Sequence, residues 1–348
     1  MNPVIPSPDP LPLPGHPSLL WALLMLTFFL HVIAMNFVLG GSILAVFARS
    51  RAQWLIKAMP TLVAAAITFG VAPLLFLQAL YGRLFFSSSV LMAWLWFAIV
   101  PALILAYYGT YASAFRKRVV IAIPIAVALL FIGISFIQSN NMTLMLRPER
   151  FLAMYLADPS GVQLNVADGT LIPRWLHMLF GAIAVAGAGF AVVGVVKKDA
   201  WAMRFGALWF TGATLLNILT GIWWLGTLPR EVLLRFMGGS PLATLWLGAG
   251  IALGFAALAM MFMAVGTSEP VKLVKGGAVA TLLTVAMMIF ARDEVRRGMF
   301  DLAGFRVTEA IAPQWDVIAI FAVLLVAALA TTVWMGVELS RVRPGNST

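Results

Sequence analysis

Two histidines within apolar stretches of the chain are the residues best suited to bind a metal. His31 stands in FFLHVIAMNFVLGG, and His177 stands in IPRWLHMLFGAIAVAGAG. Neutral imidazole is a common ligand of haem iron, so both residues are candidate axial ligands of a haem. Each also has a structural interpretation, because an imidazole can bond to a nearby carbonyl group or join an interfacial aromatic belt, as His177 could beside Trp175. The residues alone leave both interpretations open.

Small residues follow His177 along the same stretch. They leave room on a helix face for a flat macrocycle or for a neighbouring helix. The set comprises Gly181, Ala182, Ala184, Ala186, Gly187, Ala188 and Gly189. The third histidine, His16, lies among prolines near the N-terminus, where we expect it to be solvated.

A charged cluster, FARDEVRRGMF, occupies residues 290–300. In the functional interpretation, Glu294 faces inward as an oxygen ligand or proton acceptor. Arg297 then binds a haem propionate, because arginine suits planar carboxylates. Its structural interpretation is a solvated helix end with local ion pairs. Without further argument the residues favour the solvated helix end.

The chain contains no cysteine. Disulfides, thiolate zinc sites, iron–sulfur ligation and thioether attachment of c-type haem are therefore excluded. Any haem in this chain must be held without a thioether link, and further electron carriers must come from another chain.

The composition is that of a polytopic membrane protein. Of 348 residues, 62% are hydrophobic and 10% are charged, and the mean hydropathy is +0.99. A soluble domain has about a quarter charged residues, so a soluble enzyme and a disordered chain are both excluded. A transmembrane helix needs about 20 apolar residues. The nine stretches that qualify are 18–47, 55–81, 89–113, 119–139, 175–196, 203–226, 241–266, 273–291 and 314–339.

We therefore predict an all-α integral membrane protein with nine transmembrane helices. A proline-rich extracytoplasmic leader occupies 1–17, and a single transmembrane domain occupies 18–348, without an internal repeat. The loops on one side carry thirteen basic and three acidic residues, and the other side carries ten of each, so the whole net charge of +10 lies on one side. By the positive-inside rule that side is cytoplasmic, which places the N-terminus outside and the C-terminus inside. Topology explains the charge, so nucleic acid is not expected as a partner.

Against this background the chain resembles subunit I of the cytochrome bd-type quinol oxidases, which also have nine spans in this orientation. The first span is similar around His31, and FGVAPLLFLQALYGRLF resembles a segment whose glutamine matches Gln78. PRWLHMLFGAIAVAG is similar to the segment whose histidine binds the low-spin b haem, which His177 matches. EVRRGMF resembles Glu-Val-Gly-Arg-Gln-Pro-Trp, so Glu294 matches a glutamate that binds a high-spin b haem and Arg297 its arginine partner.

The resemblance covers about 18–340 and includes departures. Two carboxylates that the family uses in proton delivery are replaced by Ser89 and Phe97. The methionine that completes the low-spin haem, and the arginine two residues before it, are replaced by Gly250 and Gly248. The quinol-binding loop shrinks to LPREVLLRFMGGSP. These departures imply a divergent bd-like subunit rather than an ordinary oxidase.

The resemblance implies a membrane-embedded b-type haem subunit of a respiratory complex in a bacterial-type inner membrane. It would pass electrons between the quinol pool and a c-type cytochrome or second membrane subunit on the extracytoplasmic side. One to three haems, of b type or with a high-spin b or d type, would be held by His31, His177 and Glu294, with Gln78 as a further candidate at the cofactor site. The arginines expected at propionates are Arg174, Arg292 and Arg297. A terminal quinol:oxygen oxidoreductase subunit and a haem-free transporter or structural subunit remain the alternatives.

Overall fold

The computed structural model describes residues 12–115 and 121–341, and the regular secondary structure of this part of the chain is helical apart from one isolated backbone bridge. Within these residues nine helices are long and apolar enough to cross a membrane. The predicted all-α architecture with nine such helices is therefore confirmed. They are α1 (Pro17–Ala48), α2 (Gln53–Leu91), α3 (Ala93–Phe115), α4 (Ala122–Leu144), α6 (Leu171–Lys197), α7 (Ala200–Gly226), α9 (Pro241–Gly266), α10 (Val271–Leu302) and α11 (Trp315–Arg341).

Residues 1–11 of the predicted leader lie outside the described residues, as do the basic residues Arg116, Lys117, Arg118 and Arg343 that contribute to the predicted topology. The described end of the leader runs along the segment that enters α11. The Leu13 N–H donates to the carbonyl oxygen of Ala310 at 2.8 Å, and the Ala312 N–H donates to that of Leu13 at 2.9 Å.

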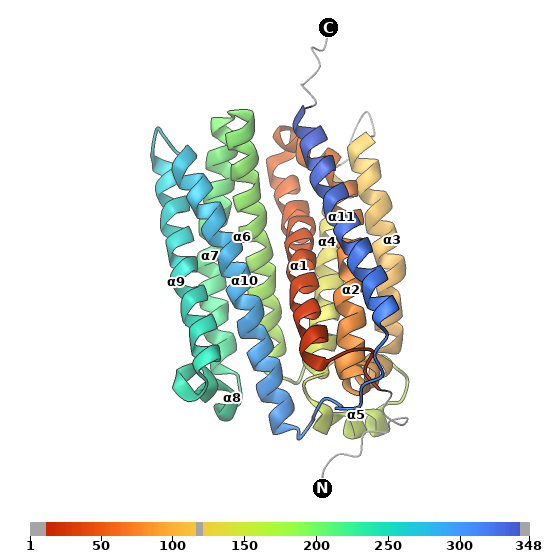
Figure 1. Cartoon of the computed structure of the whole chain (residues 1–348). Coiled ribbons are helices and arrows are strands. Elements are labelled where there is room, and N and C mark those ends of the chain that lie inside the picture. The colour runs from red at the N-terminus through yellow and green to blue at the C-terminus, as the bar shows by residue number, and fades with distance from the viewer. Residues whose placement is uncertain (1–11, 116–120, 342–348) are drawn as a thin grey trace.

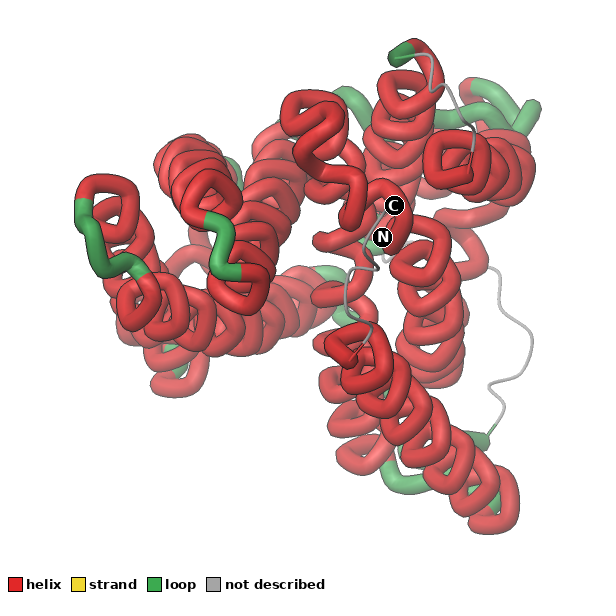
Figure 2. The backbone as a smooth tube through the Cα atoms, turned by 90° about the horizontal axis from the view of Figure 1, so that it is seen from above, coloured by secondary structure: helices red, strands yellow, loops and turns green. Residues whose placement is uncertain are grey.

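The long helices run side by side and form one bundle (Figure 1). Two short helices, α5 (Phe151–Ala157) and α8 (Arg230–Leu234), lie at the end where α1 begins, and we call this the α5–α8 end. α1, α6 and α9 lead away from that end, whereas α7 and α10 return to it. Figure 2, viewed along the helices, shows the short loops that join neighbouring helices.

Small residues set how closely the central helices approach. A Cβ on Gly40 of α1 would lie 2.2 Å from the Ala182 carbonyl oxygen of α6, and one on Gly187 would lie 2.7 Å from the backbone nitrogen of Phe210 in α7. Close approach through small residues is typical of membrane helices. The distal part of the small-residue run after His177 therefore serves helix packing.

Two predicted helices are longer than the apolar pattern indicated. The stretch expected to end at 81 breaks at Tyr81, with φ −132° and ψ 26°, but α2 resumes and ends at Leu91. The stretch expected to end at 291 continues as α10 to Leu302. Several of its charged residues are paired: Arg297 Nε donates to Asp293 Oδ2 at 2.9 Å, and Arg296 also pairs with Asp293. Hydropathy marks the apolar stretch and misses a helix end whose acidic residues are paired with arginines.

The segment that precedes α6 is tied down by Asp168. Its carboxylate accepts from Arg147 Nε at 2.7 Å and from the Thr170 N–H at 2.8 Å. Burial alone would raise the pKa of Asp168, but the Thr170 hydrogen bonds and the Arg147 guanidinium together hold this pKa below its ordinary value. Asp168 therefore carries its charge at neutral pH and fixes the entry into α6.

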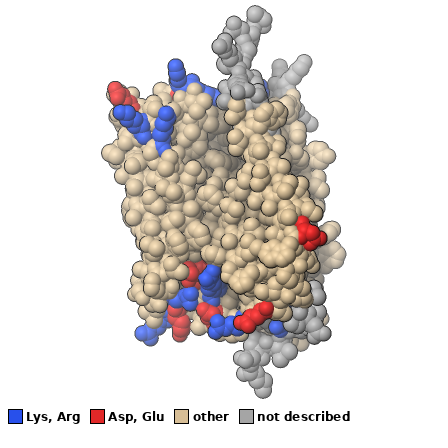
Figure 3. Space-filling view, viewed as in Figure 1, with Lys and Arg blue, Asp and Glu red and all other residues tan. Residues whose placement is uncertain are grey.

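Charged side chains gather at the two ends of the bundle (Figure 3). On the visible face the α5–α8 end carries acidic and basic side chains together, while the opposite end is mostly basic, and the wide band between them is almost without charge. Such a band suits the hydrocarbon core of a bilayer.

Candidate functional site

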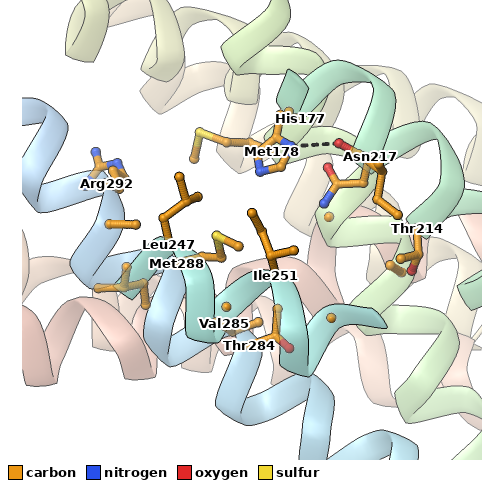
Figure 4. A pocket seen from close by; sticks show the side chains of 18 of the residues that line it. His177, Met178, Thr214, Asn217, Leu247, Ile251, Thr284, Val285, Met288 and Arg292 are labelled. Atoms are coloured by element: carbon orange, nitrogen blue, oxygen red, sulfur yellow. Dashed lines mark hydrogen bonds between the residues drawn. The ribbon is translucent and has the colours of Figure 1, made fainter. Parts of the chain in front are cut away.

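A cavity of about 450 Å³ lies among α1, α6, α7, α9 and α10. Its walls are mostly apolar, with Val185 of α6, Leu247 of α9 and Val285 of α10 among them, and His177, Asn217 and a few hydroxyl groups add polarity (Figure 4). This volume falls in the range of sites that hold small molecules and cofactors.

His177 forms part of this wall, and its ring orientation is fixed. Its Nδ1 lies 3.0 Å from the carbonyl oxygen of Asn217 in α7. Because a carbonyl oxygen only accepts, Nδ1 carries the proton and Nε2 keeps its lone pair. Gly221 lies one turn further along α7, where a Cβ would come within 3.0 Å of the ring. The arrangement supports a neutral imidazole whose Nε2 is available to a metal.

Two arginines mark the part of the cavity nearest the α5–α8 end. Arg292 lines both this cavity and an adjoining small one of about 10 Å³, and Arg174 lines the small one. The Nε atoms of both are buried without a hydrogen-bond partner. Arg292 stacks over Phe28 at 4.5 Å, and Arg174 lies 5.8 Å from the centroid of the Trp224 ring.

Neither arginine forms an ion pair within the described residues. Arg174 Nη1 donates to the carbonyl oxygen of Met142 and to Thr143 Oγ1, both at 3.3 Å, which are neutral acceptors. A buried charge without a counter-charge costs several kcal/mol. Two such guanidinium groups beside one cavity are therefore suited to a ligand with negative charge at one edge.

His31 is held in the same manner on α1. Its Nδ1 lies 3.0 Å from the carbonyl oxygen of Ala66 in α2, and a Cβ on Gly70, one turn further along α2, would lie 2.9 Å from the ring. Its ring centroid lies 6.5 Å from that of Phe28, which lines the large cavity. His31 itself lines neither the large cavity nor the small one.

Glu294 also lies away from both cavities. It is buried on α10, and its Oε2 accepts from Arg235 Nη2 at 2.8 Å. Arg235 sits in the π-helical segment that follows α8, and it also reaches Asp301 at 3.2 Å. The carboxylate predicted as an iron ligand is thus engaged in an ion pair.

The remaining predicted residues lie apart from the cavity. Arg297 pairs with Asp293, stacks 4.8 Å over Trp21 and is partly exposed. Gln78 is half-buried on α2 and lines neither cavity. Of the predicted site residues, the structure brings His177, Arg174 and Arg292 together. No cluster of three or more metal-ligating side chains occurs in the described part of the chain.

Several residues of this site carried no recognisable signal in the sequence. The carbonyl of Asn217 is a backbone group, so any residue type could supply it. Gly221 and Gly70 each come four residues after the residue whose carbonyl oxygen bonds to a histidine. The sequence does not reveal which helices pair, so this spacing could not be recognised in it. Arg235 is 59 residues from Glu294, and only the fold makes them neighbours.

The fold and this site define an all-helical protein with nine helices suited to a membrane, among its described residues, and a ligand-sized cavity between helices. No known family model and no curated protein matches the chain.

Proposed function

We propose that this chain is a membrane-embedded b-type haem subunit of a respiratory complex, which passes electrons between the quinol pool and a partner cytochrome or membrane subunit. One observation carries the proposal. His177 offers a neutral imidazole to an apolar cavity with Arg292 in its wall and Arg174 in the small cavity that adjoins it, and neither arginine has an ion-pair partner among the described residues.

The residues present fit a haem. Haem is flat and largely apolar, with two carboxylates on one edge, and its iron takes a neutral imidazole ligand. His177 Nε2 would bind the iron, the apolar walls would cover the macrocycle, and Arg174 and Arg292 would bind the propionates through charge-assisted hydrogen bonds. A bound haem would supply one-electron transfer.

The protein residues have separate roles in this proposal. The Asn217 carbonyl holds the Nδ1 proton of His177 and keeps the ring in the metal-binding tautomer. Leu247 and Ile251 belong to the apolar wall that would cover the macrocycle. Arg292 and Arg174 add positive charge at one edge, which stabilises the reduced form and so raises the reduction potential of a bound haem.

A second haem at His31 belongs to the proposal, since the same carbonyl-and-glycine arrangement presents its Nε2. The support for Glu294 as an iron ligand is weaker, because its carboxylate would first have to leave Arg235. His31 and Glu294 are thus separate tests of how far the resemblance extends.

Electron transfer is favoured over oxygen reduction. The two positions where the resemblance expects proton-delivering carboxylates hold Ser89 and Phe97. Ser89 Oγ accepts from Asn141 Nδ2 at 3.0 Å, and the Phe97 side chain is exposed on α3. Neither residue can release a proton at neutral pH.

We further propose that the α5–α8 end faces the extracytoplasmic side of a bacterial-type inner membrane. The opposite end carries Lys197, Lys198, Lys272 and Lys275, as the positive-inside rule requires of a cytoplasmic face. The arginine-bearing side of the cavity is then near the outer surface, where an extracytoplasmic cytochrome could accept electrons.

The test is haem analysis of the chain purified from membranes of haem-replete cells, followed by addition of a quinol. We expect a Soret band, reduced α bands and reduction of the haem by the quinol. A colourless protein would overturn the proposal in favour of a transporter or structural subunit. Oxygen uptake driven by the quinol, without an added acceptor, would instead establish a terminal oxidase.

A further inference from the structure

We propose that the thioether sulfur of Met288 is the second axial ligand of the haem iron bound by His177. This inference rests on the proposed function, because it assumes a haem in the cavity. His177 and Met288 both line the cavity, from α6 and α10 respectively, and both side chains extend toward the same space (Figure 4).

Each of the two side chains lies a short step along its helix from an arginine that lines the small cavity, Arg174 on α6 and Arg292 on α10. His177 is three residues beyond Arg174 on α6, and Met288 is four residues before Arg292 on α10. At a rise of about 1.5 Å per residue, these are steps of about 5 and about 6 Å. Because α6 leaves the α5–α8 end and α10 returns to it, both steps lead in the same direction.

Gly250 of α9 makes room for Met288. A Cβ at position 250 would lie 2.7 Å from the Met288 Cε and 3.3 Å from its Sδ. Any larger residue there would displace the end of the Met288 side chain. The glycine therefore lets the thioether rest against the cavity wall opposite α6.

The other methionines at the cavity are less well placed. Met178 follows His177 on the same helix, and its sulfur accepts a hydrogen bond from Ser139 Oγ at 3.9 Å, which turns it toward α4. Met35 lies seven residues beyond Phe28 on α1, or about 10 Å deeper. Since Phe28 contacts Arg292, Met35 is well below the level of His177.

The bond would use a lone pair of the Met288 sulfur and release nothing. With His177 and Met288 both bound, the iron would have no site left for oxygen or carbon monoxide, and methionine ligation would raise the reduction potential. Such ligation suits a haem at His177 that transfers electrons and does not bind oxygen.

The experiment compares Met288→Leu with Met178→Leu in the purified full chain. Spin state is read by resonance Raman and electron paramagnetic resonance, and carbon monoxide binding by the reduced difference spectrum. We expect the Met288 variant to keep the haem signal that depends on His177 while that haem becomes high-spin, binds carbon monoxide and falls in midpoint potential. The Met178 variant should match the wild type.

A second pair of variants tests the contact from α9. Gly250→Ala should displace Met288 and shift the same haem toward high spin, whereas Gly248→Ala should not, because nothing lies within 4 Å of a Cβ at 248. A Met288 variant whose haem stays low-spin would overturn the assignment while leaving the proposed function intact. A chain that holds no haem at His177 would overturn both.

Discussion

His177 and His31 are presented by matching helix pairs, α6 with α7 and α1 with α2. In each pair a carbonyl of the second helix lies 3.0 Å from the histidine Nδ1. In each, a glycine four residues after that carbonyl leaves room beside the ring. Both imidazoles are therefore held neutral, with the Nε2 lone pair available to a metal.

The surroundings of the two rings differ. His177 borders the large cavity and lies one turn along α6 from Arg174, whereas His31 borders neither cavity and has Phe28 as an aromatic neighbour. Orienting an imidazole and making room for a ligand beside it are therefore separate tasks. A carbonyl group orients both His31 and His177, but of these two histidines it is His177 that borders a cavity.

The largest expected effect comes from removing each imidazole in turn. His177→Ala deletes the proposed iron–nitrogen bond in the cavity, so we expect the associated haem signal to fall to near zero. His31→Ala should leave that signal in place. The measurement is haem content per chain with the reduced difference spectrum, and equal losses in both variants would remove the distinction between the two sites.

The next effect concerns the arginines. Replacing Arg174 or Arg292 with glutamine removes a charge-assisted hydrogen bond worth about 1.5–3 kcal/mol, or about 10- to 150-fold in haem affinity. The midpoint potential should fall as well, because a nearby positive charge is lost. Haem transfer to apomyoglobin measures the affinity.

Arg297→Gln is the matched control for these two variants. Its guanidinium pairs with Asp293 and lies outside the cavity. We expect haem retention close to that of the wild type. A loss in this variant as large as that in the Arg292 variant would instead place a propionate at Arg297.

A smaller effect is expected from the glycines beside the rings. In Gly221→Ala the new Cβ would approach the His177 ring at 3.0 Å, and such overpacking costs about 1–3 kcal/mol. The ring must tilt, so the spectrum and midpoint potential of the cavity haem should shift while haem is retained. Gly70→Ala should leave that haem unchanged, and a shift of equal size there would show that the two sites are coupled.

The smallest effect is expected from Asp168→Asn, which loosens the entry into α6 and leaves α1 untouched. Because the pKa of Asp168 is held below its ordinary value, its stabilising contribution is complete above the unfolded-chain value of about 3.9 and is lost as the pH falls through the folded-state pKa. The variant should lose about 1 kcal/mol at pH 7 and show a weaker dependence of stability on acid pH. Thermal unfolding followed by circular dichroism at pH 7 and at about pH 3, below the unfolded-chain value, measures this, and an unchanged acid profile would contradict it.

The sequence was sufficient for the architecture, because nine apolar stretches predict the nine helices that, among the described residues, are long and apolar enough to cross a membrane. It was insufficient where polar residues continue a helix, as at Asp293 and Arg296, because their pairing is visible only in the fold. At the site, His177 stood out as an ionisable group in an apolar stretch. Glu294 stood out for the same reason, but its partner Arg235 comes from a distant loop, and no local pattern could reveal that pair.

The most direct test of the proposed haem site is an experimental density map of the full chain purified from haem-replete membranes. We expect flat density in the large cavity, joined to His177 Nε2 on one face and to Met288 on the other, with its acidic edge against Arg174 and Arg292. A cavity filled by lipid chains, with His177 bonded only to Asn217, would overturn the haem site.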